Sequence, residues 1–174
     1  MRYRDYNPLG KEQEMGSDQK HKPLTGEEIA RRISAAEDTR LKAKSDYEGE
    51  YWDGFMRGLQ RNNQADDTLA KEDHGYWMSI GVRKGNTRST VGKADINVRF
   101  RGLGYRAGYS GYYDVPQAAL HCRLLIARIE RGWTQCEMAE ALGAGMRTLQ
   151  HWEWAERAVP GTVAKLLDVL GGKE

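Results

Sequence analysis

Two short amphipathic segments joined by three small residues constrain the fold of this 174-residue chain more than any other feature. Thr134 followed by Glu137 forms a capping box, which predicts the start of a short helix. Residues 143–145 read Gly-Ala-Gly and favour a tight turn, because glycine supplies the left-handed backbone at a helix end. The next segment places Leu149 and Trp152 on one inner face. This order predicts a helix-turn-helix.

Helices on both sides of this motif would complete a small bundle. Apolar residues at helical spacing predict one helix between Pro116 and Gly132. A second apolar helix follows near the end of the printed sequence, with Val163, Leu166, Leu167 and Leu170. These four side chains suit either the core of the bundle or contact with a second copy of the chain. We expect a mainly α protein in which residues 114–174 form a helix-turn-helix bundle of four to five helices.

Residues at characteristic spacings between Ala118 and Leu170 carry a family pattern. They are Arg128, Gly132, Trp133-Thr134-Gln135, Met138-Ala139, Leu142-Gly143, Leu149, Trp152-Glu153 and Pro160. The pattern resembles the Cro and phage-repressor type of helix-turn-helix domain, the XRE family. The resemblance implies a transcriptional regulator that binds specific sequences in double-stranded DNA as a homodimer. It also implies a repressor from a phage or another mobile element.

The resemblance further implies which side chains contact DNA. The second helix of the motif would lie in the major groove, with Met146, Arg147, Gln150 and His151 facing base edges and nearby phosphates. Gln135 would contact the DNA backbone. Arg147 is the best candidate to read guanine, because its guanidinium fork matches the two acceptors of that base. His151 suits an ordinary polar surface position equally well.

One internal ion pair fits the family pattern, and two positions depart from it. Arg128 and Glu153 are expected to pair inside the domain, as the family resemblance implies. Gly145 stands where Ser or Thr commonly caps the second helix, and Trp154-Ala155 replaces an Arg-Gly that commonly ends it. Both departures affect the ends of the helix that would read DNA.

The net charge of +2 conceals a strongly basic middle segment. Residues 75–117 hold seven Lys or Arg against two Asp or Glu, and aromatic residues are interleaved with these cations. Cations and flat rings together are typical of a surface that binds a partner carrying phosphates. The same pattern also fits a solvated basic surface over an aromatic core. The phosphate-contact candidates in the basic aromatic segment 75–113 are Arg83, Lys84, Arg88 and Lys93.

Residues 1–113 show weaker patterns. Few apolar residues occur before residue 24, so we expect residues 1–23 to form a mobile arm. Residues 24–113 form a helical region, with helices predicted over 26–44 and 50–62. Alternating apolar residues on either side of Gly85-Asn86 predict a β-hairpin within residues 76–100.

An aromatic and glycine rhythm occurs twice in this region, from Tyr51 to Leu59 and from Tyr105 to Tyr112. It is similar to segments of ribosome modulation factor and its phage-borne relatives, which bind ribosomal RNA, but chance or a common requirement for close helix packing, as expected at Gly54 and Gly58, accounts for the same rhythm. An alternative function follows. Residues 24–113 would be an effector that binds a protein or ribonucleoprotein partner, with the helix-turn-helix regulating its own operon or serving as a docking module.

Several classes of protein do not fit the sequence. No apolar run approaches the roughly 18 residues of a membrane span, and the first ten residues do not resemble a secretory signal. Cys122, Cys136 and four scattered histidines have no metal-ligand spacing. No phosphate-binding loop or nucleophile motif occurs. We therefore expect a cytoplasmic protein that is not an enzyme and uses no metal or other cofactor.

Overall fold

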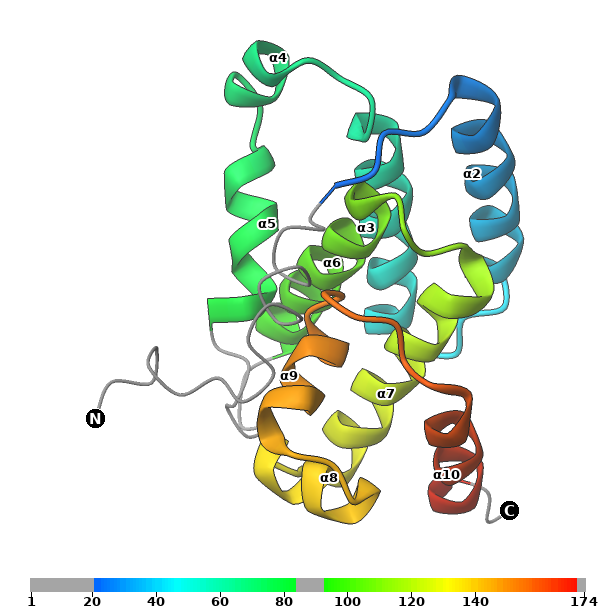
Figure 1. The fold of residues 1–174 in the computed structure, drawn as a ribbon, viewed down its shortest axis with the longest axis vertical. Helices are drawn as coiled ribbons and strands as arrows, with labels where there is room; N and C mark the ends of the chain where they lie inside the picture. Colours follow the sequence, from blue (N-terminus) through cyan, green and yellow to red (C-terminus); the bar gives the residue numbers. More distant parts are fainter. Residues whose placement is uncertain (1–20, 84–92, 172–174) are drawn as a thin grey trace.

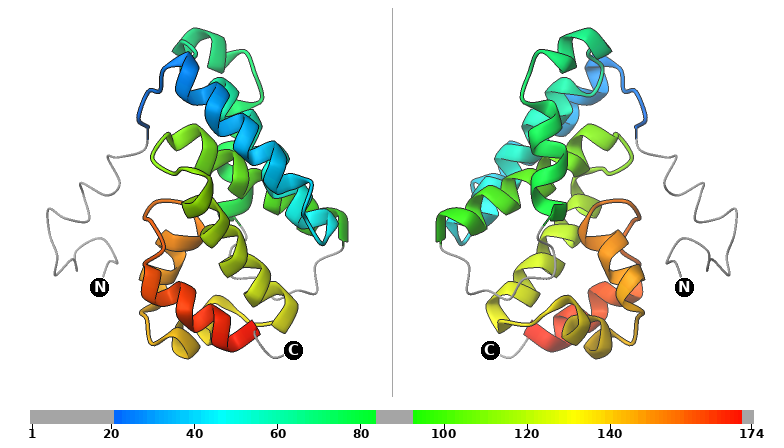
Figure 2. Two further views of the ribbon diagram at one scale, coloured as in Figure 1. Left: turned by 90° about the vertical axis from the view of Figure 1, so that its right-hand side faces the viewer. Right: turned by 90° about the vertical axis from the view of Figure 1, so that its left-hand side faces the viewer.

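The computed structural model describes residues 21–83 and 93–171, and within these ranges the chain forms nine helices and no strand (Figure 1). The helices are α2 (Gly26–Arg40), α3 (Asp46–Arg61), α4 (Asp66–Ala70), α5 (His74–Arg83), α6 (Lys93–Ser110), α7 (Val115–Arg131), α8 (Gln135–Leu142), α9 (Met146–Glu153) and α10 (Gly161–Gly171). The first five gather at one end of the molecule and the last three at the other, with α7 between them (Figures 1 and 2). The prediction of a mainly α protein is confirmed for these residues.

Capping side chains define several helix boundaries. The Thr25 hydroxyl accepts a hydrogen bond from the backbone N–H of Glu28 and starts α2. Ser45 does the same for α3, which therefore begins four residues before the predicted position. Gly132 and Gly143 adopt left-handed backbone conformations, with φ of 65° and 68°, at the ends of α7 and α8. These boundaries follow from local capping chemistry.

The predicted β-hairpin is wrong. Residues 76–83 of the predicted hairpin lie in α5 and residues 93–100 lie in α6, whereas the residues between them, with the expected turn at Gly85-Asn86, lie outside the described residues. The segment is helical because its apolar residues recur at intervals of three or four and form one apolar face of α6. These residues are Ile96, Phe100, Leu103 and Ala107. A few residues of such a helical face can also look like the alternating pattern of a strand. The alternation of apolar residues alone therefore predicted the wrong structure.

Four glycines bring α3 and α6 into backbone contact. A Cβ placed on Gly54, Gly58, Gly104 or Gly108 would lie 2.0 to 2.3 Å from a backbone carbonyl oxygen of the other helix. The contacts advance in the same direction along both helices, so α3 and α6 run parallel. The expected close packing at Gly54 and Gly58 is confirmed. The repeated glycine rhythm has this packing role in the fold.

Helix α7 contributes to two apolar cores. One face packs against the core built by α2, α3 and α6, through Val115, Ala118, Cys122, Leu125 and Ile129. Leu124 points into the second core, which α8, α9 and α10 complete. The expected boundary between residues 113 and 114 coincides with the N-cap of α7. A fragment that begins there would nevertheless expose the first face of α7 to water.

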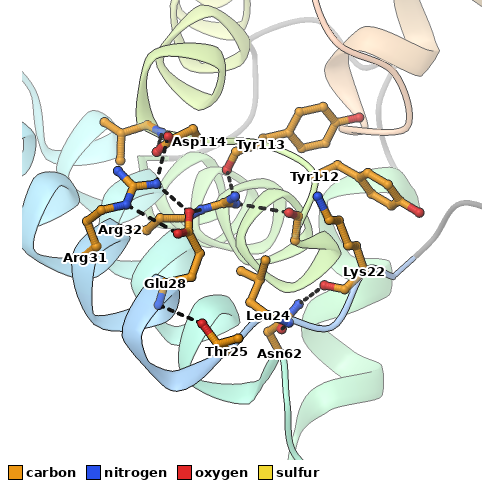
Figure 3. A network of polar contacts seen from close by, with 12 residues as sticks. Lys22, Leu24, Thr25, Glu28, Arg31, Arg32, Asn62, Tyr112, Tyr113 and Asp114 are labelled. Carbon is orange, nitrogen blue, oxygen red and sulfur yellow. Dashed lines mark hydrogen bonds and ion pairs between the residues drawn. The ribbon is translucent and has the colours of Figure 1, made fainter.

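The segment before α2 is attached to the ends of α3 and α6, which differs from the prediction of a mobile arm for residues 21–23. The Asn62 side chain accepts a hydrogen bond from the Leu24 N–H at 2.7 Å and donates to the carbonyl oxygen of Lys22 at 2.9 Å (Figure 3). It also donates to the carbonyl oxygen of Tyr109 at 2.8 Å. The His21 ring stacks on Tyr109. Residues 21–23 therefore belong to the folded part. The rest of the expected arm, residues 1–20, lies outside the described residues.

A buried arginine joins α2 to the start of α7. Arg32 donates to the carbonyl oxygens of Gly111 and Tyr113 at 3.0 and 3.1 Å and pairs with Glu28 (Figure 3). Arg31 bridges Glu28 and Asp114, which is the N-cap residue of α7. These contacts fix where α7 begins relative to the first core.

Candidate nucleic-acid interface

Helices α8 and α9 form the expected pair of short helices joined by a tight turn. Thr134 and Glu137 make the complete capping box at the start of α8. Met138, Leu149 and Trp152 are buried in the second core, so the inner faces of both helices pack as the apolar pattern predicted. The opposite face of α9 is left toward solvent.

A buried ion pair connects α7 to the end of α9. The Nε of Arg128 donates to Glu153 at 2.6 Å and its Nη2 donates at 3.2 Å, and each side chain is only 1% exposed. A third donor group, Nη1 of Arg128, bonds to the Trp133 carbonyl. Complete burial raises the pKa of the Glu153 carboxyl, and Arg128 opposes that shift. The pair expected from the family resemblance is present in the structure.

Gln135 belongs to this network and does not face solvent. Its exposed fraction is 0%, its Nε2 donates to Glu153 at 2.9 Å, and its Oε1 accepts from Gln150 at 3.1 Å. Direct contact with the DNA backbone, as expected from the sequence, does not fit this burial. Gln135 instead links the buried Arg128–Glu153 pair to Gln150 on α9. Sequence reasoning missed this role because the burial of position 135 depends on tertiary packing.

His151 is also turned toward the protein. Its Nδ1 lies 2.6 Å from a carboxylate oxygen of Glu156, and its Nε2 is buried. Glu156 also pairs with Arg106 of α6 at 3.4 Å. Burial raises the pKa of Glu156, but the hydrogen bond with His151 and the charges of Arg106 and Arg147 outweigh this effect and lower the pKa. His151 therefore contributes to the attachment of α9 and has little surface for base contact.

The exposed face of α9 consists mainly of its first turn. Met146 is 39% exposed and Arg147 is exposed, while Gln150 is partly buried beside them. Gly145 provides no side-chain hydrogen bond at the N-cap, in agreement with the departure noted in the sequence. Of the two acidic residues of α8, Glu137 is engaged in the capping box, whereas Glu140 is exposed.

Three cations of the basic segment, Arg99, Arg101 and Arg106, contribute to the fold. Arg99 is buried, Arg101 pairs with Glu50 at 3.2 Å and lies over the Trp77 ring, and Arg106 is held by three acceptors. The rings of Phe100, Tyr105 and Tyr113 are likewise buried. This part of the segment gives little support to a phosphate-binding surface.

The four predicted phosphate contacts lie elsewhere in the segment. Arg83 ends α5 and Lys93 begins α6, while Lys84 and Arg88 lie outside the described residues. Their contact with phosphate stays a prediction.

The described ranges contain no group of three His, Cys, Asp or Glu side chains arranged to hold a metal ion. Cys122 is buried and Cys136 is exposed, and both are free thiols. None of the described helices is long and apolar enough to cross a membrane.

Comparison with family models, with curated proteins and with solved structures found no match to this chain. The resemblance to the XRE family therefore stays a prediction.

Proposed function

We propose that this chain binds specific sequences in double-stranded DNA through α9 and regulates transcription, as a repressor from a phage or mobile element. One observation carries the proposal. The motif of α8, turn and α9 presents Arg147 on an exposed face, while a buried chain of polar contacts from Arg128 through Glu153 and Gln135 orients Gln150 next to it. Preorganised polar side chains on one helix face suit recognition in the major groove.

Each exposed side chain has a matching base contact. Arg147 can donate two hydrogen bonds to guanine, and Met146 can pack against the methyl group of thymine. Gln150 uses one N–H on Gln135, so its oxygen and its second N–H are available for adenine. Gln135 acts as a positioning residue, and His151 is not among the proposed base contacts.

Binding as a homodimer would place two copies of α9 on one DNA site. Val163 and Leu167 of α10 close the second core, but Leu166 and Val169 are 40% and 72% exposed. We propose that these two side chains contribute to contact between copies, because a single short helix reads only a few base pairs.

The test is the affinity of an Arg147→Ala variant for the DNA site that the full chain selects. Binding to that site should weaken by about 1–3 kcal/mol, and the preference over a scrambled site should fall. Arg123→Ala is the matched control, because it also removes an exposed arginine. Arg123 lies on α7 and pairs with Asp168 of α10 at 2.6 Å, so it does not belong to the proposed DNA-reading helix. An equal loss on selected and scrambled DNA would mean that Arg147 contacts phosphate only.

A further inference from the structure

The last turn of α9 and the residues after it are docked on the N-terminal helices. Ala155 is buried in the first core, and Trp154 packs against the same core. The backbone of Ala155 has φ of 57°, a left-handed conformation that residues other than glycine rarely adopt. The surrounding packing therefore holds this segment in a conformation that an isolated helix end would avoid.

Arg106 of α6 makes the polar part of this attachment. Its Nε donates to the Trp154 carbonyl at 3.0 Å, its Nη1 to the Met78 carbonyl at 2.7 Å, and its Nη2 to Glu156 at 3.4 Å. Trp154 is the C-cap residue of α9, so its carbonyl belongs to a helix end that has no partner within the helix. One planar guanidinium thus joins the middle of α5 and the end of α9 to α6.

We propose that Arg106 is a positioning residue for DNA reading, through which the N-terminal helices fix the orientation of α9. The inference rests on the proposed function. Arg147 and Trp154 lie at opposite ends of α9, separated by about 10 Å along the helix axis at 1.5 Å per residue. A tilt of about 10° about the Trp154 end would therefore move Arg147 by nearly 2 Å, which is enough to lose bidentate contact with guanine.

This role gives the N-terminal helices a defined effect on recognition. The attachment involves α5 and α6, so a change in how these helices pack would alter the orientation of α9. Contact between α6 and phosphate is not required. The inference thus differs from the expectation that the basic segment adds affinity through its cations.

The experiment compares Arg106→Gln with Arg101→Gln in the full chain. Arg101 lies on the same helix and loses the same charge, but its partners are Glu50 of α3 and the Trp77 ring of α5, whereas Arg106 contacts the end of α9. Three readouts are needed for each variant: circular dichroism, hydrogen exchange at the amides of residues 154–157, and affinity for the selected and a scrambled DNA site. Arg106→Lys is the second variant, because an ammonium cannot reproduce the fork of three contacts.

Arg106→Gln should retain its helical signal at 20 °C, exchange faster at residues 154–157, and lose about tenfold in affinity for the selected site while the scrambled site changes little. Arg101→Gln should resemble the original chain in all three readouts. Arg106→Lys should show the same loss of preference to a smaller degree.

A structural role alone would lower the thermal midpoint of the Arg106 variants and leave the ratio of the two DNA affinities unchanged at 20 °C. That result would overturn the inference but leave the proposed function intact. If the original chain selects no sequence at all, both the proposed function and this inference fail.

Discussion

Replacing Gly54 by alanine should separate α3 from α6 and destabilise the protein strongly. The added Cβ would lie 2.0 Å from the carbonyl oxygen of Arg101, which is 1.4 Å short of the 3.4 Å at which ordinary contact begins. The obstacle is backbone, so no side-chain rotation can relieve it. The two helices must shift along their whole contact, which includes the buried rings of Tyr51 and Phe55.

The expected magnitude lies at the upper end of overpacking effects. Forcing one additional methyl group into a packed core typically costs about 1–3 kcal/mol, and the rigid obstacle favours about 3 kcal/mol. For a chain of this size the thermal midpoint should fall by about 6–12 °C. Unfolding in urea, followed by circular dichroism, measures the free-energy change directly.

Gly49 provides the matched control on the same helix. Nothing lies within 4 Å of a Cβ at this position, so Gly49→Ala should stabilise the protein by about 0.5–1 kcal/mol through helix propensity. The two substitutions add the same methyl group to α3 and should have opposite signs. A Gly54→Ala variant within about 0.5 kcal/mol of the original chain would refute the proposed backbone contact between α3 and α6.

Three further predictions concern the polar contacts. Glu153→Ala leaves the Arg128 cation buried without its carboxylate, so urea unfolding should show a loss of about 3–5 kcal/mol, and a loss below 1 would contradict the buried pair. Asn62→Asp should cost at least about 2 kcal/mol, because a carboxylate cannot donate to the carbonyls of Lys22 and Tyr109; unchanged thermal unfolding would contradict this network. Hydrogen bonds from Arg31 and Arg32 lower the pKa of Glu28 to about 2, so the stability that these pairs provide is present above the unfolded pKa near 4.3 and is lost as the pH falls toward 2. Glu28→Gln should therefore flatten the decline of the thermal midpoint between pH 5 and pH 2, whereas Glu27→Gln should not, and equal slopes in both variants would count against the pairing.

Local chemistry explains what the sequence could predict. The capping box at Thr134, the glycines that end α7 and α8, and the apolar spacing of α8 and α9 are all encoded within a few neighbouring residues. The close packing at Gly54 and Gly58 was also predictable, because two glycines in a helix need a steric reason. The Arg128–Glu153 pair was expected only from the family resemblance.

The rest depends on contacts between distant parts of the chain. Asn62 belongs to a polar stretch, and its burial follows only from the return of residues 22–24 to the end of α6. The burial of Gln135 and the turning of His151 toward Glu156 likewise require the packed neighbours. In the basic segment, Arg106 could not be distinguished from a surface cation, because charge counts do not reveal which arginines meet buried acceptors.

The proposed DNA binding is tested most directly by selection from a random pool of double-stranded DNA. The purified full chain would be used at about 150 mM salt, where binding through phosphates alone is suppressed. We expect an enriched inverted repeat with half-sites about one helical turn apart and a guanine in each half-site whose preference disappears in Arg147→Ala. A pool that stays random after repeated rounds would contradict sequence-specific DNA binding by this chain.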